Sequence, residues 1–191
     1  MEPNELQEAR TNPEFLKFLG EKEQTARESK NIKELYEVLD SMLILDLDPT
    51  KIDSIYEEIL KISFGRVEEK LANSGTFDID TDEFFCARAL YEYAIEQWSN
   101  KNYRGAKEMF FILFSLLNDI KLQNALMVHI LNTHKSINLD DFYTKVAHSS
   151  QNEDEKYGYF ITNFDFDIED YLSKNSKFID EINQQLQALM R

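Results

Sequence analysis

The sequence predicts an all-α protein, built either as stacked helical hairpins or as a helical bundle of seven to eight helices. Two observations support this class. Most of the chain repeats apolar residues at intervals of three and four, the spacing of one helix face. The 191 residues also include only 5 glycines and 3 prolines, which leaves few residues for the tight turns of a β fold. A hydrophobic content of 42% is enough for a packed core.

The expected helices of the N-terminal half begin at recognisable capping residues. Asn12 and Pro13 predict the N-cap and first residue of a short helix, which we expect to end before Gly20. A second helix then carries isoleucine and leucine at helical spacing. Asp48 and Pro49 predict the start of a third helix, because proline at the first position loses no hydrogen bond.

Four further helices are expected before the most polar part of the chain. Asp80 and Glu83 have the spacing of a capping box ahead of the first, and Asn138 is the expected N-cap of the last. The expected spans are about 81–99, 103–118, 120–135 and 139–148.

The C-terminal part begins with a polar, acidic segment at 149–156, which predicts a loop. Residues 157–166 are ambiguous, because their aromatic residues alternate as in a strand and no partner strand is expected. A final helix is expected over 168–189. We therefore expect 1–148 to form a helical-hairpin domain, with the acidic loop and C-terminal helix of 149–191 packed on the same domain.

Residues 87–120 carry large and small side chains at the spacing of a tetratricopeptide repeat, a helix-turn-helix unit of about 34 residues. Small residues are needed where the two helices approach closely, and aromatic residues fill the space between them. The matching positions are Leu90, Ala94, Tyr103, Ala106 and Phe110. The segment departs from the repeat at Gln97, Leu113 and Asn118.

In such repeats the first helix of each hairpin lines a concave groove. The resemblance therefore implies a client-binding stripe, which has an apolar and aromatic centre suited to a peptide groove. The alternative is that flanking helices bury this stripe as ordinary core. The residues of the implied stripe are Arg88, Tyr91, Ile95, Trp98 and, from the following unit, His129.

Residues 89–113 (ALYEYAIEQWSNKNYRGAKEMFFIL) also resemble the first repeat of the class II type III secretion chaperones. Those are small, acidic, cytoplasmic helical proteins that hold translocator subunits before export. A flagellar co-chaperone of the kind that pairs with FliS is a related possibility. The resemblance implies a non-catalytic chaperone or adaptor that binds an apolar segment of a client, such as a secreted or flagellar subunit. The alternative is a structural or assembly subunit with a permanent protein partner, and a homodimer is compatible with either.

Charge and cysteine content narrow the expected partners and compartment. With 36 acidic and 21 basic residues the net charge is −15, which disfavours nucleic acid and anionic membrane surfaces. The single Cys86 cannot form an internal disulfide, and we find neither a secretory signal nor a membrane-spanning apolar run. We expect a cytoplasmic protein with a protein partner.

Patterns that would indicate catalysis or metal binding fail on spacing. The acidic residues at positions 78, 80 and 82 begin like a calcium loop, but Glu83 and Ala89 stand where glycine and glutamate are needed. His129 and His134 are five residues apart and do not share a helix face. We therefore expect no cofactor, no metal and no enzyme, although a dispersed pair of carboxylates could still support catalysis.

Overall fold

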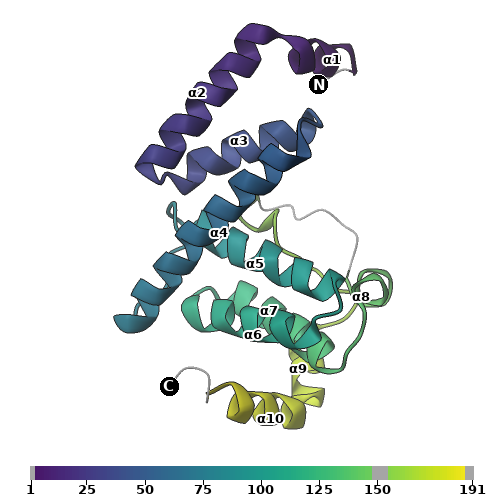
Figure 1. Cartoon of the computed structure of the whole chain (residues 1–191). Helices are drawn as coiled ribbons and strands as arrows, with labels where there is room; N and C mark the ends of the chain where they lie inside the picture. The colour runs from purple at the N-terminus through teal and green to yellow at the C-terminus, as the bar shows by residue number, and fades with distance from the viewer. Residues whose placement is uncertain (1–2, 148–154, 188–191) are drawn as a thin grey trace.

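The computed structural model describes residues 3–147 and 155–187, and within these it contains ten α-helices, one short 3-10 helix and no β-strand (Figure 1). The all-α prediction is confirmed, with more helices than expected. The helices are α1 (Pro3–Thr11), α2 (Pro13–Ser29), α3 (Ile32–Ile44), α4 (Pro49–Ala72), α5 (Phe84–Ser99), α6 (Tyr103–Leu116), α7 (Ile120–His134), α8 (Leu139–Lys145), η1 (Glu155–Tyr157), α9 (Ile168–Lys174) and α10 (Ser176–Gln187).

Five helices end in the same kind of turn. After α2, Lys30 takes a left-handed conformation (φ 52°) and the N–H of Asn31 donates to the carbonyl of Ala26 at 3.0 Å. This turn satisfies the last carbonyls of the helix and reverses the chain over a few residues. The other left-handed positions, which close α3, α4, α5 and α7, are Asp46, Ser74, Lys101 and Ser136. Among the described residues no glycine occupies such a position.

The predicted helix starts are confirmed where an Asn or Asp side chain caps the first turn. The side chains of Asn12, Asp48 and Asn138 each accept a hydrogen bond from a backbone N–H at the start of α2, α4 and α8. The expected helix end at Gly20 is wrong, because α2 continues to Ser29. A glycine inside a helix costs only about 1 kcal/mol, and the packing of α2 on α3 outweighs that cost.

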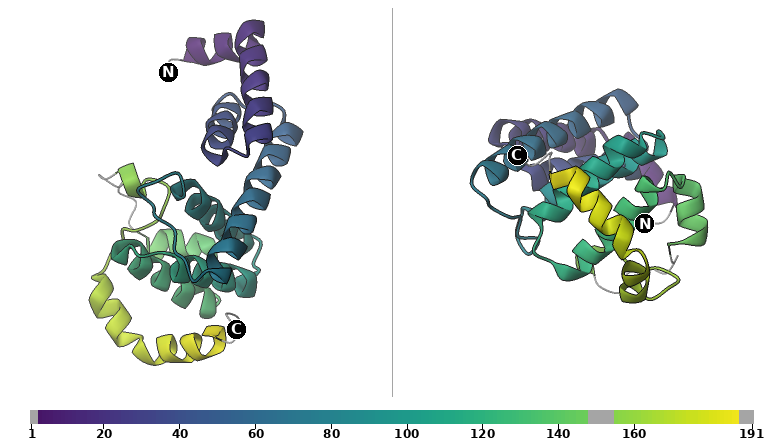
Figure 2. Two further views of the ribbon diagram at one scale, coloured as in Figure 1. Left: turned by 90° about the vertical axis from the view of Figure 1, so that its left-hand side faces the viewer. Right: turned by 90° about the horizontal axis from the view of Figure 1, so that it is seen from below.

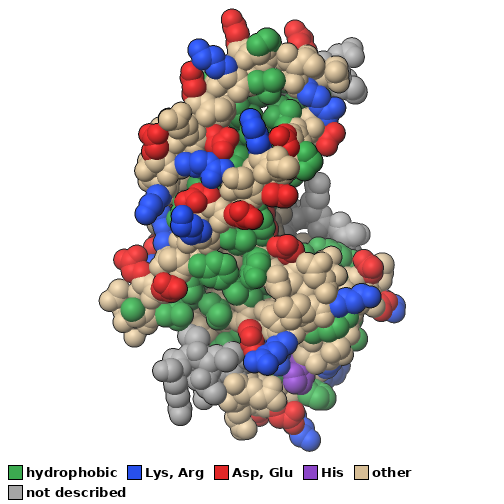
Figure 3. Space-filling view, in the orientation of Figure 1, with side chains coloured by type: hydrophobic (Ala, Val, Ile, Leu, Met, Phe, Trp, Pro, Cys, Tyr) green, Lys and Arg blue, Asp and Glu red, His purple; other side chains and the backbone are tan. Residues whose placement is uncertain are grey.

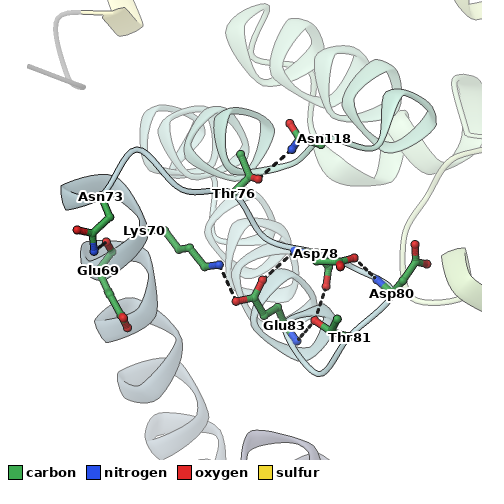
Figure 4. A network of polar contacts seen from close by, with 9 residues as sticks. All are labelled: Glu69, Lys70, Asn73, Thr76, Asp78, Asp80, Thr81, Glu83 and Asn118. Atoms are coloured by element: carbon green, nitrogen blue, oxygen red, sulfur yellow. Dashed lines mark hydrogen bonds and ion pairs between the residues drawn. The ribbon is translucent and has the colours of Figure 1, made fainter.

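The expected capping box before α5 is also wrong, and Figure 4 shows the network that replaces it. The carboxylate of Glu83 accepts a hydrogen bond from the backbone N–H of Asp78 at 2.8 Å and pairs with Lys70 of α4 at 2.6 Å. Asp78 in turn accepts from the backbone N–H of Asp80 at 3.0 Å. The acids therefore tie the α4–α5 connection to α4, and α5 begins at Phe84 without a side-chain cap.

The long helix α4 joins the two parts of the molecule. In Figures 1 and 2 the helices α1 to α3 and the start of α4 form one end and α5 to α10 form the other, with α5 packed against α4. Hydrophobic side chains gather on the molecular surface where α4 crosses α5 (Figure 3). Phe64 of α4 and Tyr93 of α5 pack edge to face, with ring centroids 5.7 Å apart. Buried apolar residues form one continuous core from Leu19 to Ile182.

The helices α5 and α6 form the hairpin that resembles a tetratricopeptide repeat. They lie side by side and pack extensively against each other. Ala94 of α5 and Ala106 of α6 are both fully buried, as are Leu90 and Phe110. The local hairpin is thus present, and α7 packs on α6 as the following helix.

The C-terminal part differs from the expected single helix. The chain breaks at Asn175 into α9 and α10, which pack on α7. Residues 158–167 consist of turns, bends and irregular structure, and they form one isolated bridge, between Ala147 and Phe164. The expected polar loop lies mostly outside the described residues. None of the described helices combines the length and apolar character needed to cross a bilayer.

Candidate functional site

The five residues of the expected client-binding stripe are buried or partly buried by other parts of the chain. Arg88 and Tyr91 are each 4% exposed, Trp98 is 1% exposed and His129 is completely buried. Ile95 is partly buried. Tyr91 and Trp98 of α5 lie against His129 of α7, whereas Arg88 is directed at α3. The prediction that the stripe forms an open client-binding surface is wrong, because four of its five residues are buried.

Trp98 and His129 are enclosed by α8 and the turn before it. The indole N–H of Trp98 donates a hydrogen bond to the carbonyl of Ile137 at 2.8 Å. The ring of Phe142 lies 4.6 Å from the Trp98 ring and 5.0 Å from the His129 ring, measured between centroids. Phe164 approaches His129 from the C-terminal segment, at 6.1 Å. These contacts make both residues part of the core.

Tyr91 and His129 form a chain of hydrogen bonds through this core. The Nδ1–H of His129 donates to the carbonyl of Ala125 at 2.7 Å, so its Nε2 accepts from the Tyr91 hydroxyl at 3.0 Å. The same hydroxyl accepts from the backbone N–H of Ile161 at 3.0 Å. Burial lowers the pKa of His129 to about 4 and raises the pKa of Tyr91, so both side chains are neutral at pH 7.

Arg88 is held between two rings and two carboxylates. Its guanidinium donates to both oxygens of Asp40 on α3, at 2.9 and 2.6 Å, and to Glu92 at 2.8 Å. It lies over the ring of Tyr36 at 4.0 Å on one side and over the ring of Tyr159 at 3.7 Å on the other. Burial acts to lower the pKa of Arg88, but Asp40 and Glu92 outweigh it and the pKa is raised. Arg88 is therefore always charged, and its charge is paired with Asp40 and Glu92.

Residues 157–166, which we call the C-terminal strap, cover Tyr91. The first residue of the strap, Tyr157, donates through its hydroxyl to Asp119 at 2.8 Å. Phe160 is buried against Tyr91 and Phe84, with ring centroids 5.1 and 5.8 Å away. The strap thus closes the stripe at Tyr91, while α8 and the turn before it enclose Trp98 and His129.

An open cleft remains between α3, α4 and α5. It is a hollow of about 270 Å³, lined by Leu39, Leu43, Ile52, Asp53, Tyr56, Arg88 and Glu92. At its edge Leu43 is 54% exposed and its neighbour Ile44 is 64% exposed. One feature of the sequence indicates this exposed surface. The last turn of α3 has apolar residues at the adjacent positions 43 and 44, and a single face of a helix cannot bury both.

The charges at this cleft are mostly negative. Burial raises the pKa of the Tyr56 phenol, and the nearby carboxylates of Glu92 and Glu96 raise it further. Asp53 lines the hollow and is exposed. The one cation in the lining is Arg88, which Asp40 and Glu92 already neutralise. The cleft therefore combines an apolar surface with an excess of carboxylates.

Two other hollows have several charged residues in their lining. One, of about 330 Å³, lies between the end of α2 and the middle of α4, and Lys30, Lys61 and Arg66 contribute to its lining. The other, of about 380 Å³, lies beside the α4–α5 connection, where Lys156 pairs with Asp80 at 2.7 Å. Within the described part of the chain, no group of three or more His, Cys, Asp or Glu side chains could hold a metal ion. Cys86 is buried, and burial raises its pKa.

Comparison with known proteins identifies no family: no family model matches the chain, and no curated protein or solved structure is significantly similar to it.

Proposed function

We propose that this protein is a non-catalytic adaptor that binds a segment of a partner protein in the cleft between α3, α4 and α5. The observation that carries the proposal is Leu43, a large apolar side chain that lines the hollow and is 54% exposed, followed along α3 by Ile44, which is 64% exposed. Adjacent exposed apolar side chains next to a concave surface are typical of protein interaction sites.

The cleft is suited to binding because its floor, formed by Arg88 and Glu92, is already held in place by hydrogen bonds. Tyr36 is fully buried and donates to Glu92 at 2.8 Å, while Glu92 also accepts from Arg88. A floor that is already ordered loses little conformational entropy when a partner binds. The same pairing argues for binding over catalysis, because the ionisable groups of the floor are occupied with one another rather than directed at the hollow.

Binding of this kind would act by mass action. The adaptor lowers the free concentration of a partner segment that would otherwise aggregate or bind elsewhere. A chaperone for an apolar client and a reversible adaptor both fit this description. A structural subunit with a permanent partner would use the same surface without releasing it.

The test places a photo-crosslinking amino acid at position 43 and, as a control, at position 120. Ile120 begins α7 and is also highly exposed, but it does not line the cleft. We expect position 43 to capture a specific protein that position 120 does not. With that protein purified, replacing Leu43 and Ile44 together by glutamine should weaken binding about tenfold or more, and Ile120→Gln should leave it unchanged.

The outcome that overturns the proposal is equal affinity of the Leu43/Ile44 variant and the unmodified chain for every partner captured. Subunit exchange distinguishes the two modes of binding. An adaptor exchanges labelled partner within minutes and remains monodisperse when purified alone, whereas a permanent subunit does neither.

A further inference from the structure

The excess of carboxylates at the cleft limits what can bind there. Asp40 and Glu92 each leave about a third of the side chain exposed, at 32% and 31%, although both are bonded to Arg88. Asp53 and Glu96 are exposed, and Glu96 is close enough to raise the pKa of Tyr56. Two carboxylates, Asp53 and Glu92, therefore line the hollow, and Asp40 and Glu96 act on the lining residues Arg88 and Tyr56. The one guanidinium in the lining is already neutralised.

An uncharged apolar partner would cover this surface at a cost. Asp40 and Glu92 accept hydrogen bonds from Arg88, and their exposed edges keep contact with water. Covering these edges would remove that water without supplying a donor in its place, which is unfavourable for a carboxylate. An acidic partner would add repulsion. A partner with Lys or Arg beside its apolar residues supplies the missing donors and gains from the long-range field.

The basic residues near the cleft do not offset its excess of carboxylates. Lys51, on the first turn of α4, acts on Asp48 and helps to lower the pKa of that carboxyl, after the hydrogen bonds from Thr50. Arg10 donates to the carbonyl of Leu45 and pairs with Asp46 at 2.9 Å. Neither lines the hollow.

We propose that the cleft between α3, α4 and α5 binds a basic amphipathic segment of another protein. The inference rests on the proposed function and specifies its partner. Apolar side chains of the segment contact Leu39, Leu43 and Ile52, and its Lys or Arg side chains pair with Asp53, Glu96 and the exposed edges of Asp40 and Glu92. A helix laid across the α3–α4 pair presents both kinds of side chain at once.

The experiment uses two labelled peptides as probes, with the same leucine positions and either lysine or glutamate at all remaining positions. Their dissociation constants are measured by fluorescence anisotropy at several salt concentrations. We expect the lysine peptide to bind at least about tenfold more tightly than the glutamate peptide, with affinity falling as salt rises.

Matched variants separate local recognition from attraction to an acidic protein. Asp53→Asn with Glu96→Gln removes two charges at the cleft, and Glu68→Gln with Glu69→Gln removes two exposed charges from the other half of α4. The first pair should weaken the lysine peptide about tenfold and the second pair less than about twofold.

Two results overturn the inference. One is equal weakening by both pairs of variants, which would mean that only net charge matters. The other is equal affinity of the two peptides, each still weakened by the Leu43→Gln and Ile44→Gln changes; that result keeps the proposed function and removes its basic partner. If the glutamine changes weaken neither peptide, the cleft is not the binding surface and the proposed function fails as well.

Discussion

At the scale of single residues, Arg88 and His129 show how polar side chains can be used as core. Each is buried among aromatic rings and bonded both within its own helix and to another one: Arg88 to Glu92 and Asp40, His129 to Ala125 and Tyr91. Buried groups of this kind cost little while their partners remain and much once one partner is removed. Both residues therefore join elements and are not free to contact a client.

Replacing Arg88 by glutamine should strongly destabilise the fold. Asp40 and Glu92 would be left partly buried without their cation, and breaking such a pair costs about 3 kcal/mol or more. Arg104→Gln is the matched control, because Arg104 pairs with Glu108 at the same i, i+4 spacing on an exposed helix face. Urea unfolding should show a large fall in midpoint for the first variant and no measurable change for the second; similar midpoints would contradict the role of Arg88.

The buried imidazole of His129 predicts a loss of stability in acid. Its pKa is about 4 in the folded protein and 6.5 ordinarily, so between these values the unfolded chain binds the extra proton. Stability is complete above pH 6.5 and should fall by roughly 3 kcal/mol as the pH drops towards 4. The free energy of unfolding at pH 7 and pH 5 checks this, with His129→Gln as the variant in which the loss over that interval should shrink. An unchanged loss would assign the effect to other groups.

At the scale of elements, the C-terminal strap decides which surface is open. The hairpin of α5 and α6 presents the aromatic side that a peptide groove would use, and the strap binds that side through Phe160 and the backbone of Ile161. The open cleft lies on the other boundary of α5, against α3 and α4. The same helix thus has one side closed by its own chain and one side available to a partner.

Truncating Phe160 to alanine should destabilise the protein by about 3 to 5 kcal/mol, because its ring is buried between Phe84 and Tyr91. Phe178→Ala provides the comparison, since that ring on α10 is half-exposed and should cost much less. Thermal unfolding followed by circular dichroism checks both. Equal losses would mean that the strap is no more firmly held than the outer face of α10.

At the scale of the whole molecule, the two ends share one core. Apolar contacts run without interruption from Leu19 on α2 to Ile182 on α10, and α4 contributes to both ends. A continuous core of this kind is expected to unfold in a single cooperative transition. The helices α3, α4 and α5, which line the cleft, therefore keep a fixed spacing.

Gly20→Ala tests this cooperativity. Gly20 lies within α2, and an added Cβ would meet no other atom within 4 Å, so alanine should stabilise the helix by about 0.5 to 1 kcal/mol. Trp98, the single tryptophan, is far along the chain on α5. Its fluorescence midpoint should rise together with that of circular dichroism. A rise in circular dichroism alone would show that the N-terminal helices unfold separately.

The sequence predicted much of the fold because helical spacing and capping are local. Asn12, Asp48 and Asn138 cap helices as expected, and Tyr91 of the expected stripe is bonded to His129. The burial of the stripe could not be predicted, because it depends on where α3, α8 and the C-terminal strap pack. The capping error at Asp80 has the same origin, since Lys70 of another helix binds Glu83.

The left-handed turns between helices have a practical consequence. Five such positions are held by Lys, Asp or Ser side chains, each at a conformation that costs a non-glycine residue of order 1 kcal/mol. Lys30, Lys101 and Ser136 are exposed. Replacing these three residues by glycine should therefore raise the thermal stability of the protein, and the changes would lie outside the binding surface.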